Sequence, residues 1–242
     1  MALEKAITSR LQSISERIRS AAARVSRNPD EIRLIAVTKT FDRTYVDAAI
    51  AAGLVDLGEN KVQEAIQKQA KSQDTIIHWH LIGHLQSNKA RKAVSAFDWI
   101  HTVDSLNLLQ RLDQAADQAG CSPNVLLQVA LAGEPSQHGA TETEVRQIVD
   151  AAGACTAFRI RGLMVLPPWS EDPERTRHYF RRLRLFRDEL RPLAPSPIQL
   201  DHLSMGMSHD FEVAIEEGAT LVRVGTALFG PRPTPQISHD NR

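Results

Sequence analysis

The sequence places one lysine where its side-chain amine could be neutral and reactive. Lys39 follows an apolar run over residues 33–38, and a strand there would bury its surroundings among Ile35 and Val37. Burial in an apolar site disfavours the charged ammonium and lowers its pKa. A neutral amine is what a Schiff-base nucleophile requires. An ion pair with Glu59, at the end of the next predicted strand, would explain the same lysine, so both interpretations stay open at this point.

Two segments near the C-terminus have the composition of anion-binding turns. Residues 204–208 read SMGMS and residues 225–230 read GTALFG, so both combine glycine with hydroxyl side chains before a predicted helix. Exposed backbone N–H groups at helix starts bind anions, and barrel enzymes commonly hold phosphate after their last two strands. Ordinary capped turns have the same composition, but two of them opposite a strand-end lysine favour a phosphate site. Gly225 and Gly230 have the spacing of a Walker motif, but Pro231 and Arg232 follow where that motif requires Lys and then Ser or Thr. The segment is therefore not a Walker motif.

A lysine amine beside a phosphate site fits two chemistries. One is a Schiff base with a phosphosugar, and the other is pyridoxal 5'-phosphate (PLP) held by a lysine and a phosphate cup. Arg223 lies two residues before the second turn. A guanidinium is always charged and only donates hydrogen bonds, so it could face a pyridine nitrogen and keep it unprotonated. This arginine favours PLP.

The remaining histidines and arginines point to structural roles. Alternation along a strand puts His78 and His80 on the same face. A metal site would also need ligands from other strand ends, and the end of strand eight carries Arg223 instead, so no metal is expected. The arginines of residues 175–187 fit the solvated face of a helix, so no nucleic acid is expected either. Four further histidines are expected to be hydrogen-bonded or solvated: His101, His138, His202 and His209.

These residues must be positioned by alternating strands and helices. A stripe from Leu3 to Val25 predicts an amphipathic helix over residues 3–26. The strands are predicted at residues 33–38, 54–57, 76–82, 98–102, 125–131, 159–165, 198–203 and 220–224. The helices that follow them are predicted at residues 42–52, 61–72, 87–95, 105–119 (N-cap Asp104), 142–152 (capping box Thr141 and Glu144), 173–190, 208–217 and 226–229.

Eight such units predict an α/β fold, a single (β/α)8 TIM-type barrel with an extra N-terminal helix, over an open doubly wound sheet. The barrel would occupy residues 1–230, and the Pro-rich polar tail 231–242 is expected to be disordered. Lys and Arg total 29 and Asp and Glu total 29 in 242 residues, a balance that argues against a broad nucleic-acid-binding surface. No apolar run is long enough to span a membrane. Without a secretory signal, and with two cysteines expected to be reduced, the chain is predicted to be cytoplasmic.

The motifs resemble one family along nearly the whole chain. They are LIAVTKT (34–40), GENKVQEA (58–65), WHLIGHLQSNK (79–89), HTVDS (101–105), RGLMVLP (161–167), LSMGMSHDFEVAI (203–215) and VRVGTALFG (222–230). The sequence is similar to the YggS/PROSC-type pyridoxal phosphate homeostasis proteins, a PLP-binding family. The resemblance implies a barrel like the N-terminal domain of alanine racemase, an association with vitamin B6 homeostasis, and no robust catalytic turnover.

The resemblance also implies the cofactor site. Lys39 would hold PLP as an internal aldimine, and Arg223 would face the pyridine nitrogen. Ser208, Gly225 and Thr226 would bind the phosphate, while Asn60 and His80 would line the pocket with Met205 and Ser204 beside it. No catalytic residue is expected. The implied partners are PLP itself and, as recipients, apoenzymes that require PLP.

Two positions depart from the family pattern. Some members carry a second lysine two residues after the first, where this chain has Phe41, and another in the loop after strand five, where it has Gln137. A part for those lysines in accepting or passing on PLP is therefore in question here.

Catalysis by the bound cofactor is the main alternative. A PLP-dependent racemase or lyase of the alanine racemase type would need a second base, and racemases take a tyrosine from an added domain. Tyr45 and Tyr179 are both predicted on helices away from the strand ends, and no residues remain for a second domain. A carrier, expected as a monomer, is favoured over a racemase. A phosphosugar aldolase is a third hypothesis, and it predicts a colourless protein.

Overall fold

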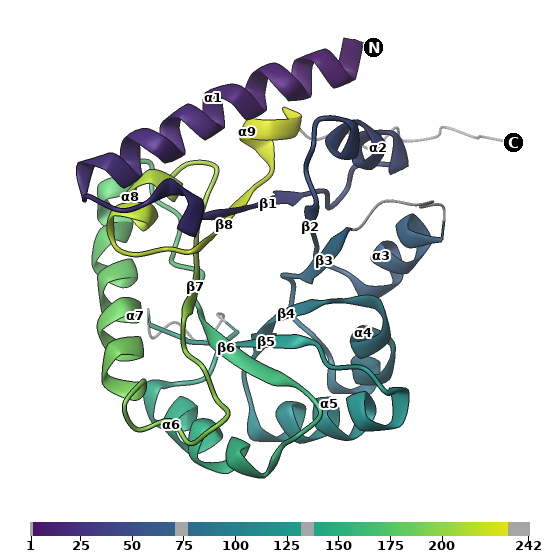
Figure 1. The fold of residues 1–242 in the computed structure, drawn as a ribbon, viewed down its shortest axis with the longest axis vertical. Coiled ribbons are helices and arrows are strands. Elements are labelled where there is room, and N and C mark those ends of the chain that lie inside the picture. The colour runs from purple at the N-terminus through teal and green to yellow at the C-terminus, as the bar shows by residue number, and fades with distance from the viewer. Residues whose placement is uncertain (1, 71–76, 132–137, 232–242) are drawn as a thin grey trace, which may run out of the picture.

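Eight parallel strands form a closed barrel with neighbours in chain order, as the computed structural model of the chain shows (Figure 1). The structure describes residues 2–70, 77–131 and 138–231. The strands are β1 (Arg33–Val37), β2 (Asp56–Glu59), β3 (His78–Leu81), β4 (Trp99–Val103), β5 (Asn124–Gln128), β6 (Arg159–Met164), β7 (His202–Met207) and β8 (Leu221–Val224). The barrel confirms the predicted fold class.

Helices surround the barrel and cover its outer face (Figure 1). They are α1 (Ala2–Arg24), α2 (Arg43–Ala51), α3 (Val62–Gln69), α4 (Ala90–Ala96), α5 (Leu106–Ala119), α6 (Glu142–Ala151), α7 (Arg177–Leu190), α8 (Phe211–Glu216) and α9 (Thr226–Phe229), with short 3₁₀ turns at Pro29–Glu31, Ser87–Lys89, Ala152–Ala154 and Pro173–Thr176. The N-terminal helix α1 buries Ile7, Ile14 and Ile18 and lies against α2, α8 and α9. Its apolar stripe therefore closes the gap between the first and last units.

Two apolar clusters stabilise this arrangement. The larger cluster joins the outward faces of the strands to the helices. The smaller one lies inside the barrel and consists of Ile35, Trp99, Leu126, Met164 and Leu221 with the partly buried Leu166. Strands buried on both faces are typical of parallel barrels, where helices cover one face and side chains fill the other.

Strand seven lies further along the chain than its sequence pattern indicates. The prediction of residues 198–203 is wrong, because β7 runs from His202 to Met207 and so contains most of the segment expected to be a turn. Pairing sets this register, with Met164 of β6 opposite Ser204 and Arg223 of β8 opposite Met207. A glycine with φ of +88° at position 206 takes up the irregularity.

Other boundaries shift by smaller amounts. Strand β2 runs from Asp56 to Glu59, two residues further along the chain than the predicted strand at residues 54–57. Ser105, not Asp104, caps α5, because the Ser105 hydroxyl accepts the Leu108 N–H. The capping box of Thr141 and Glu144 is confirmed.

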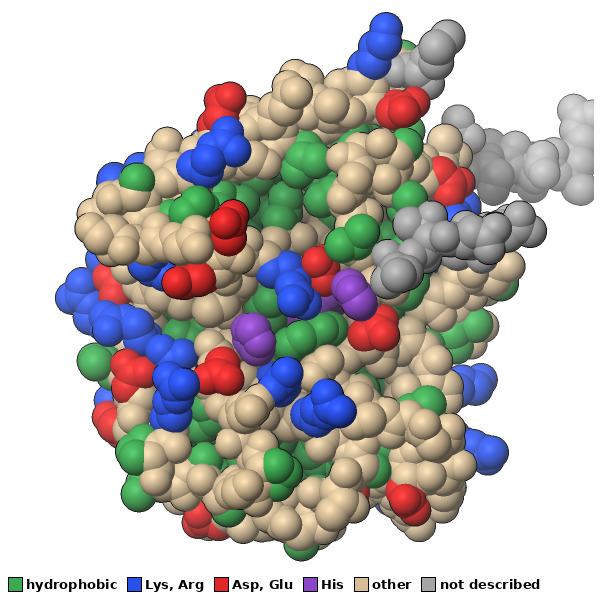
Figure 2. Space-filling view, viewed as in Figure 1, with side chains coloured by type: hydrophobic (Ala, Val, Ile, Leu, Met, Phe, Trp, Pro, Cys, Tyr) green, Lys and Arg blue, Asp and Glu red, His purple; other side chains and the backbone are tan. Residues whose placement is uncertain are grey.

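Polar side chains gather at the centre of the ring of strands. Figure 2 shows histidine, basic and acidic side chains together there. Among the described residues, no helix combines the length and the apolar character that crossing a bilayer requires. The predicted disordered tail lies outside the described residues from position 232 onward.

Candidate functional site

The turn that carries Lys39 is fixed from both sides. Lys39 is half-buried in the turn directly after β1. Before it, the Thr38 N–H donates to the Gly58 carbonyl at 3.0 Å. After it, Thr40 has a left-handed φ of +68°, and its N–H donates to Glu64 Oε1 at 2.9 Å. A non-glycine residue in this conformation persists only where its surroundings hold it, so the position of Lys39 is strongly determined.

A buried ion pair beneath this turn provides that support. Lys68 Nζ donates to Glu59 Oε1 at 2.6 Å, to the Thr38 carbonyl at 2.8 Å and to Glu64 Oε1 at 3.1 Å. Glu59 is fully buried and its Oε2 has no hydrogen-bond partner. Burial raises the pKa of Glu59, and the hydrogen bonds from Lys68 and Thr38 oppose that shift. Lys68 is thus a partner of Glu59 that the sequence did not suggest.

Arg223 lies inside the barrel, as its place on β8 predicts. Its side chain is buried, with Nη1 donating to Ser204 Oγ at 2.6 Å and Nη2 to the Val165 carbonyl at 3.0 Å. Burial lowers the pKa of Arg223 to about 10, while the charge of Asp210 raises it. The guanidinium therefore remains charged at neutral pH and can only donate hydrogen bonds.

A hydrogen-bonded chain crosses the barrel interior from Arg223 to Asp56. Ser204 Oγ lies 2.9 Å from His101 Nδ1, His101 Nε2 lies 2.9 Å from His80 Nδ1, and His80 Nε2 lies 2.9 Å from Asp56 Oδ1. Arg223 must donate at one end and a carboxylate accepts at the other. One arrangement satisfies every contact: Ser204 donates to His101, His101 to His80, and His80 to Asp56, with both imidazoles neutral.

The two histidines of this chain are set up to stay neutral. His80 and His101 are fully buried. Burial lowers the pKa of His80 against the opposing pull of Asp56, and burial with the charge of Arg223 holds the pKa of His101 well below its usual value. A neutral imidazole donates from one ring nitrogen and accepts at the other, so all hydrogen bonds of this series run in one direction. The series therefore fixes the orientation of Arg223.

Folding stability should therefore fall as the solution becomes acidic. In the unfolded chain His80 and His101 take up protons near pH 6.5, whereas in the native barrel they do so only at lower pH. Below pH 6.5 the unfolded state binds more protons, and each histidine costs up to about 1.4 kcal/mol per pH unit. We expect urea unfolding of the apoprotein to lose up to about 2 kcal/mol of stability between pH 6.5 and 5.5, about 1 kcal/mol from each histidine.

His202 adds to this loss of stability, because its pKa is lowered in the same direction. Equal free energies of unfolding at pH 6.5 and 5.5 would show that the buried histidines are charged in the native state.

The two glycine–hydroxyl segments meet at the ends of β7 and β8. Ser208 Oγ accepts the Gly225 N–H at 3.2 Å and the Ala227 N–H at 3.3 Å. A Cβ on Gly225 would lie 3.4 Å from the Val37 carbonyl, so this turn packs against the end of β1. Strand β1 pairs with β8, which places the Lys39 turn beside the Gly225 turn. The structure therefore brings Lys39, Ser208, Gly225 and Thr226 to adjacent strand ends.

Other predicted site residues have different positions. Asn60 follows β2, its buried Oδ1 has no hydrogen-bond partner, and it lines a cavity of about 300 Å³. His80 and Ser204 belong to the buried chain inside the barrel. Met205 is fully buried in the cluster between strands and helices, so the structure does not bring its side chain to the barrel interior. Phe41 packs against Tyr45 and Phe229, and Gln137 lies outside the described residues.

Sequence reasoning missed two residues of this network, Asp56 and Lys68. It predicted His101 as a hydrogen-bonded or solvated histidine, which the structure confirms, but not its partners. Asp56 gave a usable signal, because a carboxylate inside the apolar run LVDL is costly without a buried partner. His101 alternates with Trp99 on β4, which places both on the inward face. Lys68 gave no such sequence signal, because it lies on a helix among other polar residues.

The chain is similar to characterised families over almost its full length. The family model of the alanine racemase N-terminal domain matches residues 9–233. A pyridoxal phosphate homeostasis protein of Pseudomonas aeruginosa is 44% identical over 227 residues, covering 93% of this chain and 96% of the relative. One from Escherichia coli is 38% identical and covers 93% and 97%.

Solved structures agree with this similarity. The structure of PipY from Synechococcus elongatus, with PLP bound, matches with a TM-score of 0.83 and 44% identity, covering 93% of this chain and all of that one. Alanine racemase of Clostridium difficile matches with a TM-score of 0.69 at 16% identity, covering 93% of this chain and 60% of the racemase. The racemase likeness is one of fold.

Proposed function

The chain belongs to the family of pyridoxal phosphate homeostasis proteins, and on that premise we propose that it binds PLP covalently through Lys39 and holds it without robust turnover. Ser208, Gly225 and Thr226 bind the phosphate in this proposal, and Arg223 donates toward the pyridine nitrogen. The homeostasis proteins and the PLP-bound PipY structure support the cofactor. The residue assignments follow from the family resemblance, and the geometry of this chain supports them.

The observation that carries the proposal is the meeting of three strand ends. The Lys39 turn follows β1, the Ser208 hydroxyl follows β7, and the Gly225 turn follows β8, which pairs with both other strands. Ser208 Oγ accepts two backbone N–H groups, so its own proton remains to be donated to an anion. A phosphate group would find the hydroxyls of Ser208 and of Thr226 at the start of α9 on one side and a lysine amine on the other.

The deeper residues fit a pyridine ring. PLP, when bound, supplies an electron sink for bonds at an amino-acid α-carbon. Arg223 is anchored by Ser204 and the Val165 carbonyl and keeps its charge, so it donates to a ring nitrogen rather than taking up a proton from it. Asn60 Oδ1 is buried without a hydrogen-bond partner, as a group awaiting a ligand would be. An unprotonated ring nitrogen makes the sink weak.

The tyrosines support holding over turnover. Tyr45 lies on α2, where its ring packs 4.6 Å from that of Phe41 and 6.2 Å from that of Phe229. Tyr179 lies on α7, with its ring centroid 3.8 Å from that of His178. Both tyrosines of the protein therefore lie in the layer of helices and not in the barrel interior. A two-base racemization would need a proton donor that neither supplies.

Proton exchange separates a holder of PLP from a racemase or lyase. The PLP-loaded protein would be incubated in D2O with each common L-amino acid, and loss of the α-proton and of chirality followed by NMR and chiral chromatography. We expect the substrates to keep both over hours, with the visible cofactor band unchanged. Exchange at rates of about 1 s⁻¹ or more, typical of enzymes, would overturn the proposal that turnover is absent. A colourless protein that never takes up PLP would instead refute cofactor binding.

A further inference from the structure

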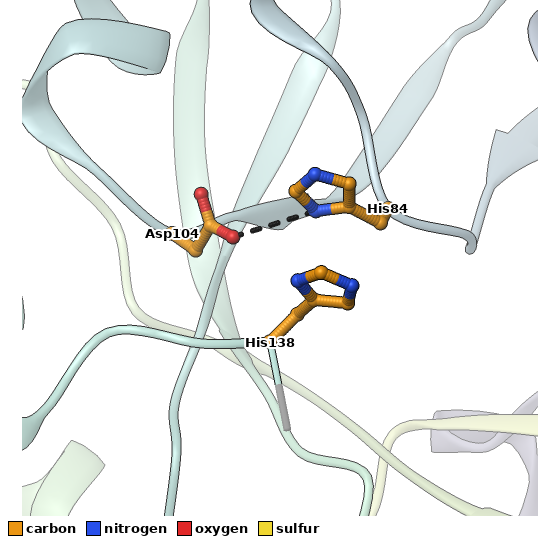
Figure 3. A group of neighbouring side chains, drawn as sticks. All are labelled: His84, Asp104 and His138. Carbon is orange, nitrogen blue, oxygen red and sulfur yellow. Dashed lines mark ion pairs between the residues drawn. The ribbon is translucent and has the colours of Figure 1, made fainter. Parts of the chain in front are cut away.

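A second group of side chains lies at the same end of the barrel, and none of its members is among the residues proposed to hold PLP. His84 follows β3, Asp104 follows β4 directly, and His138 lies in the loop after β5. Carboxyl ends of parallel strands meet at one edge of the barrel, which brings these three loops together. Figure 3 shows the three side chains turned toward one another.

Their donor atoms are close enough to share an ion. One ligand atom from each residue lies within 4.8 Å of the other two, and His84 Nδ1 is 3.6 Å from Asp104 Oδ2. In a tetrahedral site with bonds of about 2.0–2.1 Å, ligand atoms are roughly 3.4 Å apart. The His84–Asp104 separation thus already suits a shared cation.

The backbone holds each of the three residues in place. Gly83, before His84, accepts a hydrogen bond from Thr102 Oγ1 at 2.9 Å, and a Cβ there would lie 2.3 Å from the Asn60 carbonyl. The carbonyl of His138 accepts Gln128 Nε2 at 2.6 Å. Asp104 is anchored between the last residue of β4 and the N-cap of α5. Loops fixed in this way can present ligands at a small entropic cost.

The side chains themselves are accessible. His84 has 38% and Asp104 has 17% of its side chain exposed, and both line a cavity of about 470 Å³. The imidazoles of His84 and His138 are stacked, with centroids 3.9 Å apart and planes 12° apart. A metal must lie in the plane of each ring it binds, so one of the exposed rings would rotate on binding. There is space for water ligands beside them.

We propose that His84, Asp104 and His138 bind a divalent transition-metal ion of the zinc class. Two imidazoles and one carboxylate are the donor set that favours Zn²⁺, Co²⁺ and Ni²⁺ over Mg²⁺ and Ca²⁺, which prefer oxygen ligands alone. Three protein ligands leave at least one coordination position open to water or a small anion. The three ligands differ from the lysine and phosphate residues, although His84 lines the same cavity as Asn60. The proposal does not depend on the proposed function.

Titration with metal alone tests the site. Full-length protein without any affinity tag, stripped with a chelator and dialysed, would be titrated with ZnCl2 by calorimetry and with CoCl2 by visible absorption. We expect one ion per chain and a Co²⁺ spectrum typical of nitrogen and oxygen ligands. His84→Ala and Asp104→Ala should each weaken Zn²⁺ binding by about tenfold or more, with thermal unfolding of the metal-free protein recorded to confirm folding.

Two further variants make the result decisive. His178→Ala removes an exposed histidine on α7 and should leave Zn²⁺ affinity unchanged. Lys39→Ala should also leave it unchanged, which separates this site from chelation by PLP. His138→Ala is a second ligand variant in case either of the others is unstable. Absence of stoichiometric binding, or equal affinity in folded His84→Ala, Asp104→Ala and His138→Ala, would overturn the proposal.

Discussion

Replacing Lys39 by alanine should abolish the visible absorption band that the wild-type protein acquires with PLP. The band meant here lies at longer wavelength than that of free PLP and arises only when the cofactor is joined covalently to an amine. Lys39 is the lysine at the end of β1, beside the residues of β8 proposed to bind the phosphate. The loss should be complete, because removing the amine removes the bond. The measurement is a spectral titration of purified apoprotein with PLP, followed by desalting.

Two variants control this experiment. Lys39→Arg keeps a positive charge, but a guanidinium does not lose its proton in proteins, so this variant should also lack the band. Lys92→Ala removes an exposed lysine on α4 that lines the cavity beside Asn60, and it should keep the wild-type band. A full band in Lys39→Ala would show that another amine carries the cofactor.

Replacing Lys68 by methionine should cost about 3 kcal/mol of folding stability. Lys68 is buried and donates to Glu59, Glu64 and the Thr38 carbonyl, so its removal leaves a carboxyl group buried without its charged partner. Breaking a buried ion pair from one side typically costs about 3–5 kcal/mol. The lower end is expected because burial already raises the pKa of Glu59 and eases its protonation. Urea unfolding at pH 7 measures the change.

A double-mutant cycle identifies the cause. Adding Glu59→Gln to Lys68→Met removes the charge left behind and should recover part of the lost stability. Lys92→Met, at an exposed position, should stay within about 0.5 kcal/mol of wild type. If Lys68→Met were as stable as Lys92→Met, the ion pair would not support the Lys39 turn.

The alternation of elements was predictable because its signals are local. Apolar runs, caps and proline positions define each strand and helix from a few neighbouring residues, and the capping box at Thr141 is one example. Arg223 was placed correctly on β8, since its strand has a simple apolar pattern. Strand seven was misplaced because glycine and serine in SMGMS are typical of turns, while its register depends on pairing with β6 and β8.

The buried hydrogen-bonded chain was beyond sequence reasoning for a related reason. Asp56, His80, His101 and Ser204 come from four strands, and their contacts depend on the register of each strand against its neighbours. Burial of each residue could be expected from its strand, but its partner could not. The group of His84, Asp104 and His138 could not be predicted from the sequence either, because three different loops contribute one residue each.

Borohydride reduction tests the central claim most directly. Reduction of the PLP-loaded protein fixes the cofactor to whichever amine holds it, and mass spectrometry of a proteolytic digest then locates the modified lysine. We predict one cofactor per chain, attached to Lys39. Attachment to a different lysine, or an unmodified Lys39 in protein that carries the visible band, would contradict the account.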